Sequence, residues 1–61
     1  MFETVADFRN AVDNLTVIHD AYDIFEDQCT DALRGEIYQM ASPSDPEPFR
    51  SAMHRMGYTE Y

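Results

Sequence analysis

Apolar side chains recur every three or four residues through the first two thirds of this chain. The positions are Val5, Phe8, Val12, Leu15, Ile18, Tyr22, Phe25, Cys29, Leu33, Ile37 and Met40. This spacing is typical of an amphipathic helix and differs from the strict alternation of a half-buried strand. Thr4 is a suitable N-cap, with Asp7 three residues later in an approximate capping box. The pattern therefore predicts a helical region over residues 4–40.

Two places can interrupt this helical region. The apolar spacing slips by one residue near Asn14 and Thr16, and Asn and Thr are better caps than helix interiors. We therefore expect a break at residues 14–16. Gly35 follows Arg34, which is a common C-terminal pattern, yet the helical spacing continues as far as Met40. Gly35 either ends the second helix or only weakens it, and both interpretations stay open.

A proline-rich segment separates this region from a last helix. We predict a loop over residues 42–45 and a helix over residues 46–56, with Asp45 as its N-cap and a proline at its first position. The apolar face of that helix has i, i+3, i+4 and i+7 spacing. Its members are Phe49, Ala52, Met53 and Met56. Gly57 fits the left-handed position after the helix, and residues 59–61 are expected to be loose.

The predicted fold class is all-α, a small helical bundle of two to three helices forming a single domain over residues 1–61. A chain this short buries only about 60% of its unfolded surface, so its stability margin is thin. Cys29 is the only cysteine, which excludes an internal disulfide. A homodimer or a complex with another protein is therefore expected. The predicted association seam consists of Ile18, Tyr22, Phe25 and Leu33.

The charge balance limits the choice of partner. Twelve Asp and Glu residues face four arginines and no lysine, which gives a formal net charge of −8. Direct binding to nucleic acid needs a basic footprint, and an anionic membrane surface would repel this chain. A basic protein surface would attract it. No apolar run is long enough to span a bilayer and no signal-peptide pattern is visible, so a cytoplasmic location is expected.

Five carboxylates fall opposite the apolar face of the predicted long helix. This acidic row consists of Asp13, Asp20, Asp23, Asp27 and Asp31. On one helix it would extend over roughly 27 Å. Arg9 and Arg34 are spaced to neutralise its two ends, whereas its centre has no basic neighbour. One interpretation is a surface for a basic partner, such as a groove that normally holds nucleic acid. The alternative is a solvated face, made acidic for solubility or by a halophilic or acidic background.

No other set of side chains predicts catalysis, a metal or a cofactor. His19 and Asp23 have the i, i+4 spacing of metal ligands, but a hydrolytic metal site needs further histidines. Cys29 lies on the apolar face, where a buried, unreactive thiol is expected. Glu26 and Asp27 are adjacent and diverge on a helix, so they make a poor acid–base pair. The sequence therefore favours a protein that acts by binding and is not an enzyme.

In overall character the chain resembles the small acidic inhibitors made by phages and mobile elements, such as anti-CRISPR and antirestriction proteins and other nucleic-acid mimics. The resemblance rests on the small size, the pI near 4.2, the absence of lysine and the acidic row from Asp13 to Asp31. It implies an inhibitor that acts in a host cytoplasm and presents carboxylates to a basic nucleic-acid-binding site. The alternative function is a structural or regulatory subunit that pairs through its apolar face.

Overall fold

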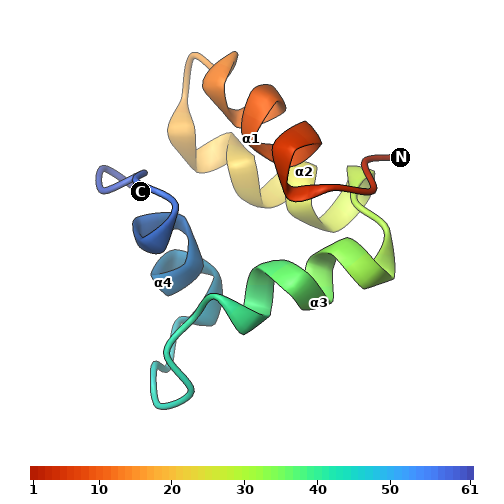
Figure 1. Ribbon diagram of the computed structural model, residues 1–61. Helices are drawn as coiled ribbons and strands as arrows, with labels where there is room; N and C mark the ends of the chain where they lie inside the picture. The colour runs from red at the N-terminus through yellow and green to blue at the C-terminus, as the bar shows by residue number, and fades with distance from the viewer.

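The computed structural model describes all 61 residues and shows an all-α protein without a sheet (Figure 1). Its elements are α1 (Val5–Asp13), the 3₁₀ turn η1 (Ile18–Asp20), α2 (Ala21–Gln28), α3 (Asp31–Gln39) and α4 (Pro48–Arg55). The predicted fold class is confirmed. The number of helices exceeds the predicted two to three, because the region 4–40 is divided into three α-helices and not two.

The first division of that region falls where the sequence predicted it. The Thr4 hydroxyl caps α1 by accepting a hydrogen bond from the Asp7 amide at 3.2 Å. The helix ends at Asp13, and the side-chain amide of its C-cap residue, Asn14, donates to the carbonyl of Asn10 at 2.8 Å. The chain then turns before η1, which runs directly into α2.

The second division, at Cys29 and Thr30, was not predicted. Cys29 is extended and forms an isolated parallel bridge with Phe2. In this bridge the Phe2 amide donates to the carbonyl of Gln28 at 2.6 Å, and the Thr30 amide donates to the carbonyl of Phe2 at 3.0 Å. The Thr30 hydroxyl then caps α3 by accepting from the amide of Leu33 at 3.2 Å. Cys29 is buried and keeps the apolar spacing, so the pattern did not reveal the break. Thr30 before an acidic first turn was the available signal.

Gly35 and the prolines act differently on the remaining helix boundaries. Gly35 lies inside α3 and does not end it. The last helix begins at Pro48 and not at Pro46, because the ring of Pro48 disfavours helical dihedrals in the preceding residue, and Glu47 has φ −122° and ψ 75°. Asp45 is therefore not the N-cap of α4. Its carboxylate accepts a hydrogen bond from the Glu47 amide at 2.8 Å within the preceding turn.

The end of α4 agrees with the sequence prediction. Gly57 has a φ of 102°, in the left-handed region that glycine adopts without strain. Its amide donates to the carbonyl of His54 at 3.0 Å, and the amide of Tyr58 donates to the carbonyl of Met53 at 2.9 Å. These two bonds form a Schellman motif, which satisfies carbonyls that the helix end would otherwise leave free.

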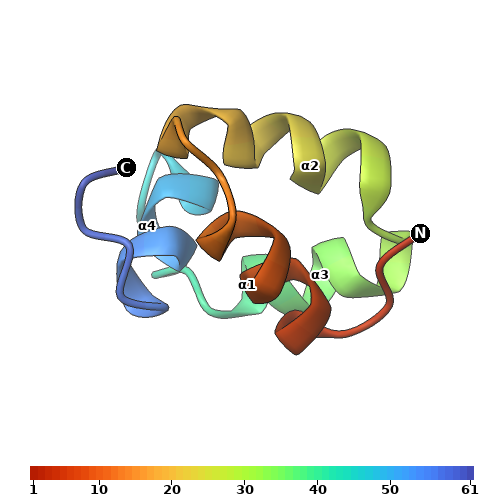
Figure 2. The same ribbon diagram turned by 90° about the horizontal axis from the view of Figure 1, so that it is seen from above.

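The core lies between the four helices and contains only apolar residues. Helix α1 packs against α2 and α3, and α3 packs against α4 (Figure 2). The buried residues are Phe8, Val12, Ala21, Ile24, Phe25, Cys29, Leu33, Ile37, Phe49, Ala52, Met53 and Met56. All four residues of the predicted α4 face are among them. The radius of gyration, 10.5 Å, is what a compact domain of this length has.

Helix α2 buries a different face from the predicted one. Ala21, Ile24 and Phe25 point into the core, whereas Tyr22 remains 39% exposed. Leu15 and Ile18 lie before α2 and are only partly buried. The turn ahead of η1 changes the register, so the apolar spacing of Leu15 and Ile18 does not continue along the inner face of α2.

Candidate functional site

The acidic row does not lie on one helix. Asp13 is the last residue of α1, Asp20 directly precedes α2, and Asp31 is the first residue of α3. Only Asp20, Asp23 and Asp27 remain together, along the outer side of α2. The expected continuous row of roughly 27 Å is therefore wrong, because the breaks near residue 15 and at Cys29 change the chain direction.

The two ends of the row are held by contacts within the protein. Asp13 accepts a hydrogen bond from the Tyr58 hydroxyl at 2.6 Å, and Asp31 forms an ion pair with Arg34. Arg9 does not form an ion pair with Asp13. Its guanidinium donates to the carbonyl of Met56 at 3.1 Å and lies over the Tyr58 ring, 5.9 Å from the centroid. These contacts attach the end of α4 to α1, so they contribute to the fold.

The centre of the row forms a compact acidic surface. Asp20, Asp23, Glu26 and Asp27 are all exposed, and we refer to these four residues as the α2 acidic face. Their backbone positions span roughly 10 Å of helix. None of them takes part in the protein's two ion pairs, which are Asp31–Arg34 and Glu47–Arg50. Arg34 approaches only the backbone here, donating from Nη1 to the carbonyl of Glu26 at 2.8 Å.

Glu26 does not belong to the acidic row that the sequence predicted. On α2 it falls between Asp23 and Tyr22 around the outer surface, so it extends the acidic face towards the aromatic side of the helix. The i, i+4 spacing of Tyr22 and Glu26 in the sequence was the signal for this placement.

The predicted association seam is not an open surface. Phe25 and Leu33 are 2% and 0% exposed within the protein's own core, and Ile18 is partly buried against it. Only Tyr22 is exposed. The four helices of one chain cover each other's apolar faces, which leaves no apolar seam of these residues for a second chain.

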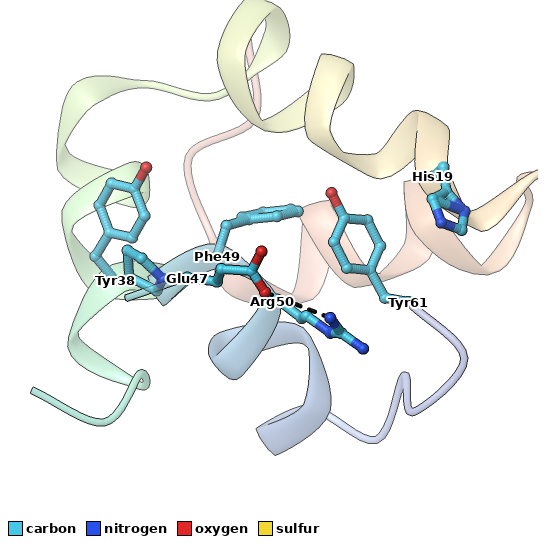
Figure 3. A pocket seen from close by; sticks show the side chains of 7 residues that line it. His19, Tyr38, Glu47, Phe49, Arg50 and Tyr61 are labelled. Carbon is cyan, nitrogen blue, oxygen red and sulfur yellow. Dashed lines mark hydrogen bonds and ion pairs between the residues drawn. The ribbon is translucent and has the colours of Figure 1, made fainter. Parts of the chain in front are cut away.

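A second distinctive feature is an open pocket of about 320 Å³ between α3, α4 and the last residues of the chain (Figure 3). Its lining residues are His19, Tyr38, Glu47, Pro48, Phe49, Arg50 and Tyr61. We refer to it as the aromatic pocket. Residues 59–61 were expected to be loose, but the Tyr61 ring lies edge-on to Phe49 at 5.2 Å and stacks on His19 at 5.4 Å.

The aromatic pocket adjoins the α2 acidic face. The ring of Tyr22, on α2, also lies edge-on to Phe49, with 5.3 Å between the centroids. The Glu26 carboxylate beside Tyr22 is the main cause that raises the pKa of Tyr22. Burial raises the pKa of Tyr61, and the charges of Asp23 and Glu47 raise it further. Both hydroxyls therefore lie in a negative potential.

The remaining chemical groups do not assemble into a further site. Cys29 is buried and free, and burial raises the pKa of its thiol, as expected for a structural cysteine. No group of three or more His, Cys, Asp or Glu side chains is placed to hold a metal ion. None of the helices combines the length and the apolar character needed to cross a membrane.

Comparisons with protein-family models, with curated proteins and with solved structures found no match to this chain. The two surfaces with distinctive chemistry are the α2 acidic face and the aromatic pocket beside it.

Proposed function

We propose that this protein acts by binding, as a small inhibitor or adaptor whose α2 acidic face docks on a basic site of another protein. The proposed partner site is one that normally holds nucleic acid, as in the anti-CRISPR and antirestriction types of inhibitor. The observation that carries the proposal is that four exposed carboxylates lie on α2 and the residue directly before it, and none of them is paired with an arginine.

The spacing of these carboxylates supports mimicry of nucleic acid. Asp20, Asp23, Glu26 and Asp27 are distributed over roughly 10 Å of helix axis. The mean axial separation of the four carboxylates, about 3.5 Å, is close to the ~3.4 Å between charges along one strand of duplex DNA, while Glu26 and Asp27 point about 100° apart around the helix axis. The full acidic row on one helix would have been sparser. The inclusion of Glu26 raises the density of charge where no arginine pairs with the carboxylates.

The cost of this arrangement to the helix also supports a binding role. Glu26 and Asp27 lie in the last turn of α2, where the helix dipole favours cations. Asp23 is also three and four residues from them, and each such like-charge pair destabilises a helix by about 0.2–0.5 kcal/mol. Asp23 lies in the first turn, where the dipole favours anions, but Glu26 and Asp27 weaken the last turn and face solvent, as expected of a surface retained for a partner.

The test compares two variants that each lose three negative charges. The first is Asp20→Asn, Asp23→Asn and Asp27→Asn, and the matched control is Glu3→Gln, Glu36→Gln and Glu60→Gln. The control residues are exposed and make no side-chain hydrogen bond or ion pair. Each protein would be used for affinity capture from a lysate of the source cells at low and high salt, followed by mass spectrometry.

The unaltered protein and the control should capture the same basic protein at low salt, and the α2 variant should not. Capture should weaken as salt screens the charges, and added duplex DNA should displace the partner. Equal capture by both variants at every salt concentration would show that the carboxylates are only a solvated face.

A further inference from the structure

We propose that the aromatic pocket binds the guanidinium group of an arginine side chain, which anchors a basic partner beside the α2 acidic face. The identity of the partner rests on the proposed function, whereas the affinity of the pocket for a guanidinium group can be measured without it. The occupant is inferred from the shape, the aromatic lining and the charge of the pocket.

The pocket presents aromatic rings on more than one side. Figure 3 shows Tyr38 and Tyr61 on opposite sides of Phe49, with the Glu47 carboxylate extending into the space between them. Phe49 lines the pocket but is only 6% exposed, so the accessible ring surface belongs to Tyr38 and Tyr61. The position of Phe49 is fixed by Phe25, at a ring distance of 4.7 Å. Aromatic faces attract a cation through the negative potential above the ring.

The charges around the pocket complement a cation. Glu47 lines it directly, and the charge of Asp23, on the α2 acidic face, helps to raise the pKa of Tyr61, which also lines the pocket. The only basic groups in the lining are His19 and Arg50, and Arg50 is paired with Glu47 at 3.3 Å. The Arg50 contact shows that a guanidinium group reaches this carboxylate within the pocket wall.

Arginine fits these features better than lysine does. A guanidinium group is planar and weakly hydrated, stacks on aromatic rings and can pair with a carboxylate through two parallel bonds. A pocket of about 320 Å³ is at the lower end of the ~300–1,000 Å³ typical of small-molecule sites, so it has room for a whole arginine side chain. An arginine of a partner would compete with Arg50 for Glu47.

The first experiment is a nuclear magnetic resonance titration of the whole chain with Nα-acetyl-arginine amide. The uncharged citrulline analogue, the lysine analogue and tetramethylammonium serve as comparison probes. The arginine probe should shift signals of Phe49, Tyr38 and Tyr61 and bind more tightly than the other three. No shift at these residues, an equal response to citrulline, or tighter binding of lysine or tetramethylammonium would overturn the proposal.

Two arginine variants test the part played by Glu47. Arg50→Gln should tighten binding of the arginine probe about twofold or more, because it frees the carboxylate from an exposed ion pair. Arg55→Gln is the matched control, since Arg55 lies on the same helix outside the pocket and removes the same charge. If the two variants bind the probe equally, Glu47 is not part of the site and the proposal fails.

Variants of Tyr61 test the aromatic contribution without removing a core residue. Tyr61→Leu should weaken binding of the arginine probe about two- to fivefold, whereas Tyr61→Phe keeps the ring and should retain it. Circular dichroism would verify that both variants keep their helices. Equal affinity of the Leu and Phe variants would show that the ring does not bind the cation.

The pocket and the acidic face can fail separately. If the Asp20, Asp23 and Asp27 triple variant still captures the partner, the proposed function fails, while a specific arginine response of the pocket keeps the present proposal. If the triple variant loses the partner and the arginine probe does not bind, the acidic face is supported and the pocket is not.

Discussion

Helices α2 and α4 are the same length but present opposite charges to solvent. Each has eight residues and buries three of them on its inner face. The outer side of α2 carries Asp23, Glu26 and Asp27 and no basic residue, whereas α4 carries Arg50, His54 and Arg55 and no acid. The core therefore accepts either sign of charge outside it. The acidity of α2 is not a requirement of the fold.

The two helices also differ in how well their charges match their own dipoles. His54 and Arg55 lie in the last turn of α4, where cations are favourable, and Gly57 completes a Schellman motif. Glu26 and Asp27 occupy the last turn of α2, where anions are unfavourable. At the last turn, α4 is therefore favoured by its own charges and α2 is not, whereas at the first turn Asp23 favours α2 and α4 has no acidic residue.

The largest expected effect tests whether the two inner faces contribute equally. Phe25→Ala in α2 and Phe49→Ala in α4 each remove a buried ring and should destabilise the protein by about 3–5 kcal/mol. A domain of this length has roughly 3–9 kcal/mol of total stability, so each variant should be largely unfolded. Urea denaturation followed by circular dichroism checks this, and a loss below about 1 kcal/mol for one variant would show unequal dependence on the core.

A smaller effect compares Gly57, which follows the end of α4, with Gly35 in the interior of α3. Gly57→Ala should destabilise the protein by about 1–2 kcal/mol, because the φ of 102° is unfavourable for a residue with a Cβ atom. Gly35→Ala should stabilise α3 by about 0.5–1 kcal/mol, since a Cβ there meets no atom within 4 Å. Thermal unfolding should show a lower midpoint temperature for Gly57→Ala and a higher one for Gly35→Ala. Shifts of the same sign would contradict the different backbone requirements assigned to the two glycines.

A still smaller effect is expected from removing single charges in the last turns of α2 and α4. Asp27→Asn should stabilise the protein by about 0.3–1 kcal/mol, and Arg55→Gln should destabilise it by a similar amount, because the helix dipole acts on opposite charges. Both differences should shrink in 1 M salt, where screening is strong. Urea denaturation at low and high salt measures them. Destabilisation by Asp27→Asn would show that this carboxylate supports the fold.

The last expected effect is a loss of stability at alkaline pH, which does not occur at neutral pH. Burial raises the pKa of Tyr58 and Tyr61, the Glu26 carboxylate raises that of Tyr22, and burial raises that of Cys29. The folded state therefore holds protons that the unfolded state releases, so stability should fall as pH rises above about 9. Thermal unfolding between pH 8 and 11 measures the decline. Tyr58→Phe should reduce its slope, and an unchanged slope would contradict the assigned cause.

The candidate site could be predicted from the sequence only in part. The exposure of Asp20, Asp23 and Asp27 followed from their spacing, because they lie on one continuous stretch of helix. The positions of Asp13 and Asp31 did not follow, since each depends on where a helix ends. The aromatic pocket could not be predicted at all, because His19, Phe49 and Tyr61 meet there from distant parts of the chain.

The sequence by itself determined the features that depend on neighbouring residues. The helical periodicity, the Thr4 cap, the break near Asn14, the apolar face of α4 and the glycine end at Gly57 are all local. Their energies are set within one or two helical turns.

Only the tertiary structure decided the break at Cys29, the face that α2 buries and the position of Tyr61. The extended Cys29 forms a bridge with Phe2, whose backbone is hydrogen-bonded to Gln28 and Thr30 on either side of it, and the Arg9 guanidinium donates to the carbonyl of Met56 and not to Asp13. These contacts join residues 27 and 47 positions apart. Helical periodicity reports only local spacing and is the same whether Cys29 continues a helix or pairs with a distant strand-like residue.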